Sequence, residues 1–345
     1  MTNPIRVGII GAGANTRKHH IPKLQAIDGV EVVSLVNRSR ESSQRVADEF
    51  GIPAIAGSWQ EIIDNDEINA IVIGTWPYMH CQLTMAALAA EKHVMCEARM
   101  AMNASEAQLM REASRAKPHL ITQIVPSPFS LGVDKTIKRL IAEGYLGDLL
   151  AVEVRARPDS FLDREGALHW RYNFDLSGLN IMSMGIWYEA LLRWVGEATN
   201  VMAKGKTFVK MRPDAEGIMR SVRIPEHIDI LADLACGAQA HIQISSVTGL
   251  GGVTEAILFG SDGTLRFTGG NNLSGGRRGD TALTPIPIPA EEQGGWRVEE
   301  EFISAIRGQE AITHTNFEDG VKYMEFTEAV TLSLQSGQGV SLPLL

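Results

Sequence analysis

Two glycines near the amino terminus have a spacing that can hold a phosphate group. Gly11 and Gly13 follow an apolar run at residues 6–10 and precede a helix-like run at 15–26. In that order Gly11 allows a tight turn, Gly13 lets the backbone approach a pyrophosphate, and the first helical N–H groups point at it. The pattern predicts a dinucleotide-binding turn, and a plain strand–turn–helix without a ligand is the alternative. The turn residues expected to contact the dinucleotide are Gly11, Gly13, Ala14, Asn15 and Thr16, the last in the third small position.

The residues after the second expected strand favour one dinucleotide over another. An apolar run at residues 30–36 predicts this strand, and Asn37 and Arg38 follow it. At this place an NAD-preferring fold carries an Asp or Glu that binds the ribose 2′-hydroxyl. Without that acid a 2′-phosphate is not repelled, and the Arg38 guanidinium can bind it with two hydrogen bonds. We therefore expect NADP to be preferred, with NAD possible, unless Arg38 only caps a surface turn.

Two further apolar runs, at residues 68–74 and 92–96, predict neighbouring strands of a parallel sheet. Ligands of such sheets lie at the carboxyl ends of the strands. The side chains delivered there, which we expect to contact the cofactor, are Thr75, Trp76, His80 and Glu97. His80 has a simple alternative role as a histidine near the start of a helix over 81–90. Glu97 has one as a structural residue.

The composition limits the class of protein. A length of 345 residues suits two domains, which we place at 1–126 and 127–345, the final residues being free to pack back on the first. A net charge of −9 argues against nucleic-acid or anionic-membrane partners. No apolar run approaches the roughly 20 residues of a membrane span, and no leader is evident. The three cysteines have no metal-type spacing, so we expect a cytoplasmic protein without a metal.

The second half of the chain predicts a sheet of a different kind. Its alternating runs follow one another without intervening helices, which is typical of an antiparallel sheet. Such a sheet often leaves one face free, and we expect that face to be buried in a homodimer or homotetramer. The Gly- and Asn-rich segment 271–280 is expected to be a mobile loop. The expected strands are 149–157, 201–209, 228–235, 238–247, 255–260 and 264–268.

Taken together, these motifs resemble the Gfo/Idh/MocA family, the group of glucose–fructose oxidoreductase and inositol dehydrogenase. The likeness spans nearly the whole chain. The matching pieces are residues 7–13, 75–80, 92–97 and 143–148, then Gly178, Gly185 and residues 302–308, 317–320 and 337–343. The resemblance implies an α/β fold. An N-terminal Rossmann domain with a doubly wound parallel sheet would bind the dinucleotide. A C-terminal α/β domain with an open, mostly antiparallel sheet would bind substrate and mediate oligomerisation.

The resemblance also implies a catalytic set, and this sequence departs from it. The family has a Lys after the Glu of the fifth strand, and an Asp and a His four residues apart on a helix of the second domain. Here Ala98 stands at the lysine position, Ser183 at the aspartate and Trp187 at the histidine. Ordinary oxidation of a secondary alcohol needs a base near the hydroxyl, so the departure puts that chemistry in doubt.

Other side chains nearby can take over the lost roles. His169 is a candidate acid/base, and Arg171 a clamp for an anionic or polyhydroxy substrate. Tyr188 can donate a proton, and Arg99 can supply part of the lysine's charge, although a guanidinium hardly ever releases its proton. Each has a simpler alternative: a surface histidine, an ion pair of Arg171 with an aspartate, or packing of Tyr188 within its helix.

We therefore expect an NADP-preferring oxidoreductase that moves a hydride between the nicotinamide and a small sugar-like or cyclic polyol substrate. Two alternatives remain open. One is glycoside cleavage by transient oxidation with a retained cofactor, a route that some relatives use. The other is a cofactor-binding sensor without catalytic activity.

Overall fold

The computed structural model describes residues 4–157 and 159–344, and the chain divides into two compact units. The first unit contains the chain up to residue 126 together with 297–321, and the second contains 127–296 and the chain from 322 onward. Within the described residues, no helix is both long and apolar enough to cross a membrane. Which unit binds cofactor and which binds substrate stays a prediction.

The first unit is built on a six-stranded parallel sheet in the order β3-β2-β1-β4-β5-β6. The order reverses at β1, where a doubly wound sheet opens a crevice for a ligand. Ile71 and Ile73 of β4 are fully buried, as a central parallel strand covered on both faces requires. The strands are β1 (Ile5–Ile10), β2 (Val30–Val36), β3 (Ala54–Ile55), β4 (Ala70–Ile73), β5 (His93–Cys96) and β6 (Thr122–Ile124).

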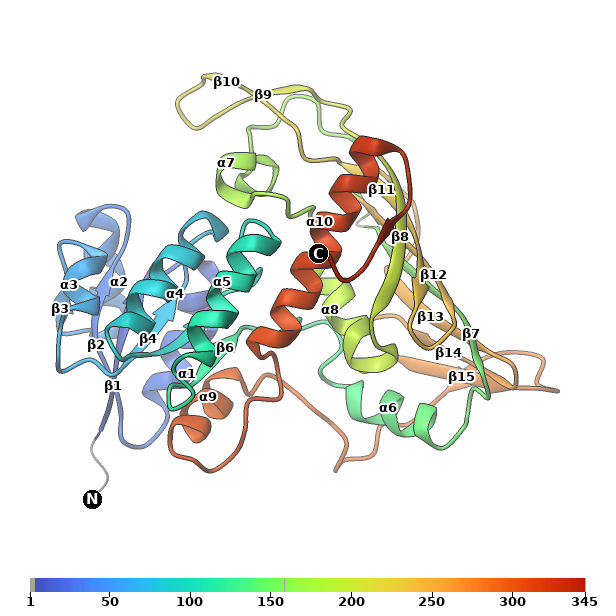
Figure 1. The fold of residues 1–345 in the computed structure, drawn as a ribbon, viewed down its shortest axis with the longest axis horizontal. Helices are drawn as coiled ribbons and strands as arrows, with labels where there is room; N and C mark the ends of the chain where they lie inside the picture. The colour runs from blue at the N-terminus through green and yellow to red at the C-terminus, as the bar shows by residue number, and fades with distance from the viewer. Residues whose placement is uncertain (1–3, 158, 345) are drawn as a thin grey trace. The chain divides into compact units, whose positions relative to one another are not determined.

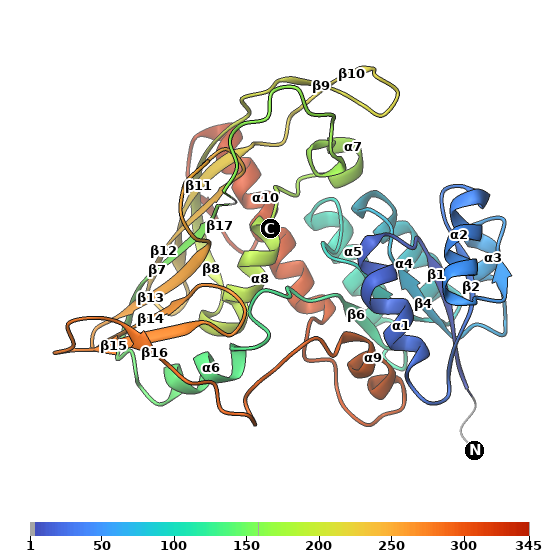
Figure 2. The same ribbon diagram turned by 180° about the vertical axis from the view of Figure 1, so that it is seen from behind.

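Helices cover both faces of this sheet. In Figure 1, α4 and α5 lie in front of the strands, and Figure 2 shows α1 on the opposite face. Side-chain oxygens cap α2, α3 and α5, those of Ser39, Ser58 and Asn103. The elements are the short helices η1 (Thr16–His20) and η2 (Pro77–Met79), with α1 (Ile21–Gln25), α2 (Arg40–Phe50), α3 (Trp59–Ile63), α4 (His80–Ala89), α5 (Ala104–Arg115) and α9 (Val298–Ile306).

The second unit is built on a nine-stranded sheet in the order β16-β15-β14-β13-β7-β12-β11-β8-β17. All of its pairs are antiparallel except β7 with β12, so the expected mostly antiparallel sheet is confirmed. A separate hairpin joins β9 and β10. The strands are β7 (Leu149–Ala156), β8 (Ala198–Lys206), β9 (Met211–Pro213), β10 (Met219–Ser221), β11 (His227–Leu234), β12 (Gln239–Ser245), β13 (Glu255–Gly260), β14 (Gly263–Phe267), β15 (Leu273–Arg277), β16 (Thr284–Pro285) and β17 (Val340–Ser341).

Helices pack on one face of this second sheet (Figures 1 and 2). Phe267 of β14 meets the rings of Trp187 and Trp194 from α8, with centroid distances of 6.5 and 5.8 Å. On the other face Met202 of β8 pairs with Leu231 of β11, and the two side chains are 44% and 60% exposed. The helices are α6 (Asp134–Ala142), η3 (Trp170–Tyr172), α7 (Phe174–Ser177), α8 (Met184–Val195) and α10 (Phe317–Ser336).

One segment differs from the expected secondary structure. The stretch 271–280, expected to be a mobile loop because of its glycines, contains strand β15, paired with β14 and β16. Gly275 and Gly276 within it are buried. A Cβ at Gly275 would lie 2.6 Å from Ile286 Cδ1, so these glycines allow close packing and do not mark a flexible segment.

Candidate functional site

The glycine turn follows β1 directly, as the sequence predicted. Gly11 has φ +87°, and a Cβ there would lie 2.8 Å from the backbone nitrogen of Thr75. Only glycine can hold this conformation at this distance without strain. Gly13 is more open, because a Cβ there would meet only the Gly74 oxygen, at 3.6 Å. The Arg17 N–H donates to the Gly13 carbonyl at 3.0 Å and begins the helical segment.

Thr16 fits the third small position because its neighbour is a glycine. Its side chain is buried, and its hydroxyl donates to the Gly11 carbonyl at 3.4 Å. A Cβ on Gly74 would lie 2.2 Å from Thr16 Oγ1 and 2.1 Å from the Gly11 oxygen. The threonine therefore occupies space that a side chain at Gly74 would take, and it does not block the turn.

One residue after β4 that lies close to the glycine turn is Thr75. Thr75 Oγ1 is buried and has no hydrogen-bond partner among the residues that the structure describes. Thr75 follows β4 and lies against Gly11. The Thr75 hydroxyl oxygen is covered by protein atoms in this structure, so the feature that fits a dinucleotide phosphate is the open backbone at Gly11 and Gly13.

Asn37 and Arg38 have different roles at the end of β2. Asn37 Oδ1 accepts a hydrogen bond from the Ala12 N–H at 2.6 Å, and its amide donates to the Ser42 carbonyl at 3.1 Å. Asn37 thus holds the glycine turn as a neutral side chain. Arg38 is exposed, and its guanidinium carbon lies 5.4 Å from the centre of the Trp76 ring. The loop presents a cation over an aromatic ring and no carboxylate at this position.

A buried charge cluster lies beside the turn, and its central member was not expected from the sequence. His20 Nε2 lies 2.9 Å from Glu97 Oε1, and His20 Nδ1 lies 2.5 Å from Glu299 Oε1. His20 and Glu299 are fully buried, while the Glu97 side chain is 14% exposed. Asn15 donates its amide to the same Glu97 oxygen. Glu97 and Asn15, two expected cofactor residues, are therefore brought together by a histidine that the glycine motif does not contain.

The electrostatics of this cluster favour its charged form. Burial alone would lower the pKa of His20, but the hydrogen bonds to Glu299 and Glu97 outweigh burial and raise that pKa to about 9. Burial acts to raise the pKa of Glu97, and the bond to His20 overcomes it, so that the pKa of Glu97 is lowered. At neutral pH the cluster holds an imidazolium between two carboxyl groups.

His80 and Arg99 are buried in the same unit. His80 Nδ1 lies 2.9 Å from the Arg99 carbonyl oxygen, and His80 Nε2 lies 3.0 Å from the Thr75 carbonyl oxygen. Burial lowers the pKa of His80 although both contacts oppose it. The ring therefore links the loops after β4 and β5. Arg99 is only 1% exposed, which favours a structural role over direct contact with a substrate.

A pocket of about 780 Å³ lies within the second unit. It brings together His169 and Arg171, from the segment around η3, with Ser183 and Trp187, from the start of α8. These are two of the four candidate substitutes and two of the positions at which the family resemblance leads us to expect replaced titrating residues. The remaining walls are mostly apolar or hydroxyl-bearing. They are formed by Pro128, Phe129, Ala156, Tyr172, Met182, Ile186, Ile244, Ser245, Ser246, Thr254, Phe267, Thr268, Gly269 and Gly270.

The two candidate substitutes in this pocket differ in charge. Partial burial and then the charge of Arg171 lower the pKa of His169, so the imidazole is neutral at pH 7. Its Nδ1 accepts the Arg171 N–H at 3.3 Å. The Arg171 guanidinium carbon lies 4.3 Å from the centre of the Trp170 ring. A neutral base and a cation thus stand next to each other at the pocket.

Tyr172 is a pocket residue that the sequence reasoning missed. Its hydroxyl donates to Ser246 Oγ at 2.8 Å, and Ser246 Oγ donates to the Glu226 carbonyl at 3.2 Å. With its proton directed away, the Tyr172 oxygen keeps a lone pair for a substrate hydroxyl. Nothing in the spacing of residues 163–172 distinguishes this tyrosine from its neighbours, because Ser246 is far along the chain.

Tyr188, the tyrosine chosen from the sequence, lies in the protein core. It is 2% exposed, its ring stacks on Phe326 at 3.7 Å, and its hydroxyl accepts the Ala198 N–H at 2.8 Å. Burial raises the pKa of Tyr188 further above its usual value. It does not line the pocket of His169. This placement argues against the proton-donor role expected from the sequence, because its oxygen is already used to satisfy a buried backbone donor.

Solved structures share this fold over nearly the whole chain. A levoglucosan dehydrogenase solved with NADH and L-sorbose has a TM-score of 0.84 and 21% identity, over 98% of this chain and 99% of its own. The WlbA dehydrogenase of Bordetella pertussis, solved with NADH and UDP-GlcNAcA, has a TM-score of 0.82 and 20% identity, over 99% and 100%. At these identities the likeness shows the fold alone.

Curated relatives are similar in amino-acid sequence to parts of this chain. A 4-carboxy-2-hydroxymuconate-6-semialdehyde dehydrogenase of Sphingobium is 34% identical over 90 residues, 26% of this chain and 28% of that protein. This chain therefore matches little more than a quarter of that relative's length. A dTDP-3,4-didehydro-2,6-dideoxy-alpha-D-glucose 3-reductase of Streptomyces antibioticus is 24% identical over 268 residues, 76% of this chain and 75% of that protein.

Two family models match most of the chain between them. Residues 5–123 match the oxidoreductase family with an NAD-binding Rossmann fold, and residues 135–266 match the GFO/IDH/MocA C-terminal domain. Both matches agree with the folds of the two units, the parallel sheet in the first and the mixed sheet in the second. The chain belongs to the Gfo/Idh/MocA family of NAD-binding oxidoreductases.

Proposed function

We propose that this protein moves a hydride between a nicotinamide cofactor, preferably NADP, and a small sugar-like or cyclic polyol compound. The observation that carries the proposal is the pocket of the second unit, where a neutral imidazole, a guanidinium and a phenol oxygen surround one cavity. Sugar-like ligands or substrates are named for several relatives and neighbours, including levoglucosan dehydrogenase and the dTDP-sugar reductases. That agreement supports the substrate class.

The proposed roles follow from what each side chain can do. His169, neutral at pH 7, is the proposed acid/base. Because its Nδ1 accepts the Arg171 N–H, Nε2 carries the ring proton, and this contact has to open before Nδ1 can accept the hydroxyl proton of the substrate. Tyr172 accepts a hydrogen bond from a second hydroxyl of the substrate, and Arg171 binds a further hydroxyl or an acidic group. The Trp187 indole, 5.0 Å from the Phe129 ring, covers the apolar face of the substrate ring and excludes water. The bound nicotinamide supplies the hydride acceptor or donor.

The cofactor preference is proposed from the first unit. Gly11, Gly13 and Thr75 would hold the pyrophosphate region, and Arg38 would bind a 2′-phosphate while resting on Trp76. Asn37 supports this assignment, since it supplies the polar side chain at the end of β2 without a negative charge. The further expected cofactor contacts, at Ala14, Asn15, Thr16, His80 and Glu97, stay proposals.

A second candidate function is a cofactor-binding sensor. The substitutions Ala98, Ser183 and Trp187 favour it, because none of these side chains can exchange a proton at neutral pH. A screen of polyols, keto sugars and glycosides with NADP(H) and NAD(H), followed at the nicotinamide absorbance, separates the candidates. Turnover that changes the absorbance supports the oxidoreductase. Hydrolysis of a glycoside without net cofactor change indicates redox-assisted cleavage. Tight NADPH binding with no reaction across the panel supports the sensor.

A further inference from the structure

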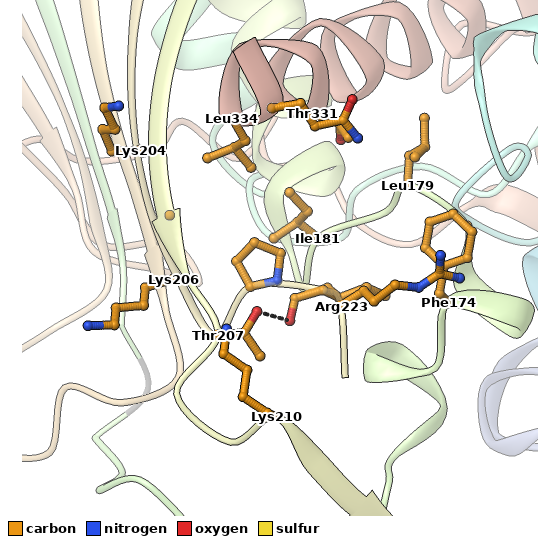
Figure 3. A pocket seen from close by; sticks show the side chains of 15 residues that line it. Phe174, Leu179, Ile181, Lys204, Lys206, Thr207, Lys210, Arg223, Thr331 and Leu334 are labelled. Atoms are coloured by element: carbon orange, nitrogen blue, oxygen red, sulfur yellow. Dashed lines mark hydrogen bonds between the residues drawn. The ribbon is translucent and has the colours of Figure 1, made fainter. Parts of the chain in front are cut away.

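A second cavity, of about 530 Å³, lies elsewhere in the second unit. Figure 3 shows it between β8 and the carboxyl-terminal part of α10, with α7 and the segment that follows α7 on its other side. It shares no lining residue with the pocket of His169. The proposed chemistry does not use it, and of the residues in the family motifs only Gly178 lines it.

The charged side chains of this cavity are all basic. Lys204, Lys206, Lys210 and Arg223 line it, and its fifteen lining residues include no Asp or Glu. This is unusual for a chain with a net charge of −9. Among the residues that the structure describes, none of the four forms an ion pair within 4.0 Å. A basic cluster without internal counter-charge attracts an anion.

Two of the four cations, Lys210 and Arg223, lie on neighbouring segments at this cavity. Figure 3 shows Arg223 extending across the cavity toward Phe174, and its guanidinium carbon lies 3.9 Å from the centre of that ring. Lys210 is held beside the Arg223 segment, because the Val222 N–H donates to the Lys210 carbonyl at 2.8 Å. The Lys204 and Lys206 side chains point away from Leu334 and Ile181, which lie on the other side of β8. We therefore assign anion recognition to Lys210 and Arg223.

The rest of the cavity is apolar with a few neutral polar groups. Ile181, Ile224 and Leu334 line it, and the first two are buried. Gly205 of β8 adds bare backbone to the wall. A Cβ there would lie 3.2 Å from Leu334 Cδ2. A cavity with basic side chains at its rim and apolar walls favours a ligand that has both an anionic group and an apolar body.

We propose that this cavity binds a small anionic molecule with an apolar body, such as an aromatic or aliphatic phosphate ester or carboxylate. The site also adjoins the substrate pocket through one short segment. Gly178, Leu179 and Ile181 line this cavity, whereas Met182 and Ser183 line the pocket of His169. A ligand bound here contacts the back of the segment that carries Ser183. This inference goes beyond the proposed function and does not depend on it.

The test uses three probes that separate the two parts of the ligand: phenyl phosphate, inorganic phosphate and phenol. Each is titrated calorimetrically into the full-length protein, with and without saturating NADPH, so that the cofactor site cannot account for the signal. Phenyl phosphate should bind more tightly than either inorganic phosphate or phenol. The double variant Lys210→Gln/Arg223→Gln should weaken phenyl phosphate by roughly tenfold or more, since two charge-assisted contacts are lost.

Arg220→Gln is the matched control, because Arg220 lies close to Arg223 in sequence but is paired with Asp214 at 2.8 Å. Its affinity for phenyl phosphate should equal that of the wild type. Equal affinity in the double variant and the wild type would overturn the proposal. So would inorganic phosphate binding as tightly as phenyl phosphate, which would indicate a basic surface without a shaped site. If the double variant does not fold, as judged by its thermal transition, Lys210→Gln alone is compared with the control.

Discussion

His20 Nδ1 lies 2.5 Å from Glu299 Oε1 inside the first unit, although 279 positions separate the two residues in the sequence. Both side chains are fully buried, and Glu97 completes the cluster from the end of β5. Glu299 belongs to α9, so a helix from the far end of the chain sets the charge beside the glycine turn. Removing one member would leave a buried charge without its partner, which is strongly destabilising.

This cluster predicts a pH dependence of stability. The pKa of His20 is raised from 6.5 to about 9 on folding, so its contribution to the free energy of unfolding is complete below pH 6.5. It is lost as the pH rises through about 9, and the loss amounts to about 3 kcal/mol. Chemical denaturation at several pH values measures it. His20→Gln should flatten this dependence, whereas His119→Gln, at a 61% exposed side chain, should not. An unchanged pH profile in His20→Gln would contradict the assignment.

A second prediction concerns the cofactor. Wild-type protein should bind NADPH more tightly than NADH in a direct titration. Arg38→Ala should weaken NADPH by roughly 1.5–3 kcal/mol, the worth of a hydrogen bond to a charged group, and leave NADH nearly unchanged. Arg45→Ala is the control, because Arg45 is an exposed arginine of α2 already paired with Glu41 at 2.8 Å. Equal affinities of the wild type for the two cofactors would sink the preference for NADP.

A third prediction concerns the pocket residues. His169→Ala should lower kcat by about 10²–10⁴-fold, the usual contribution of a positioned acid–base group, while NADPH affinity stays the same. Tyr172→Phe should lower kcat/KM by about 0.5–1.5 kcal/mol, the worth of one hydrogen bond to the substrate. Tyr188→Phe should instead lower stability by about 1–3 kcal/mol, because the buried Ala198 N–H loses its acceptor, and should keep kcat. If Tyr188→Phe lost activity while remaining folded and the other two variants kept it, the roles proposed for the three residues would have to be exchanged.

A fourth prediction concerns assembly. Leu231 and Met202 lie next to each other on the helix-free face of the second sheet and are 60% and 44% exposed. We expect this face to be buried in a homodimer or homotetramer, and light scattering at micromolar concentration should give at least twice the monomer mass. Leu231→Glu should shift the protein toward the monomer. Leu109→Glu, at a 56% exposed position of α5, should not. A monomer mass for the wild type would rule the assembly out.

The sequence predicted the regular elements well because their causes are local. The run 30–36 is strand β2 with the same bounds, and the run 255–260 is strand β13, also with the same bounds. Period, capping and turn chemistry are all encoded within a few residues. The strand at Leu273–Arg277 was missed because its stability comes from pairing with β14 and β16, which a local pattern does not contain.

The candidate site could be predicted only in part, for the same reason. The glycine turn is one continuous motif, whereas the contact of His20 with Glu299 and that of Tyr172 with Ser246 join distant segments. Tyr188 is a candidate from the sequence because it follows Trp187, the position that the family resemblance assigns to a histidine. Neighbouring residues of a helix point in different directions, so the residue after Trp187 does not face the same pocket. The Tyr188 side chain lies in the core instead.

Transfer of a labelled hydride tests the central claim most directly. The protein is incubated with NADPH deuterated at the transferable position of nicotinamide C4 and with a panel of keto sugars and cyclic polyol ketones, and the products are examined by mass spectrometry. We expect one compound to gain a single deuterium on carbon, in an amount equal to the NADPH consumed. His169→Ala should form this product far more slowly while still binding NADPH. Saturating NADPH binding with no deuterium found in any compound of the panel would contradict the proposal that this protein is an active oxidoreductase.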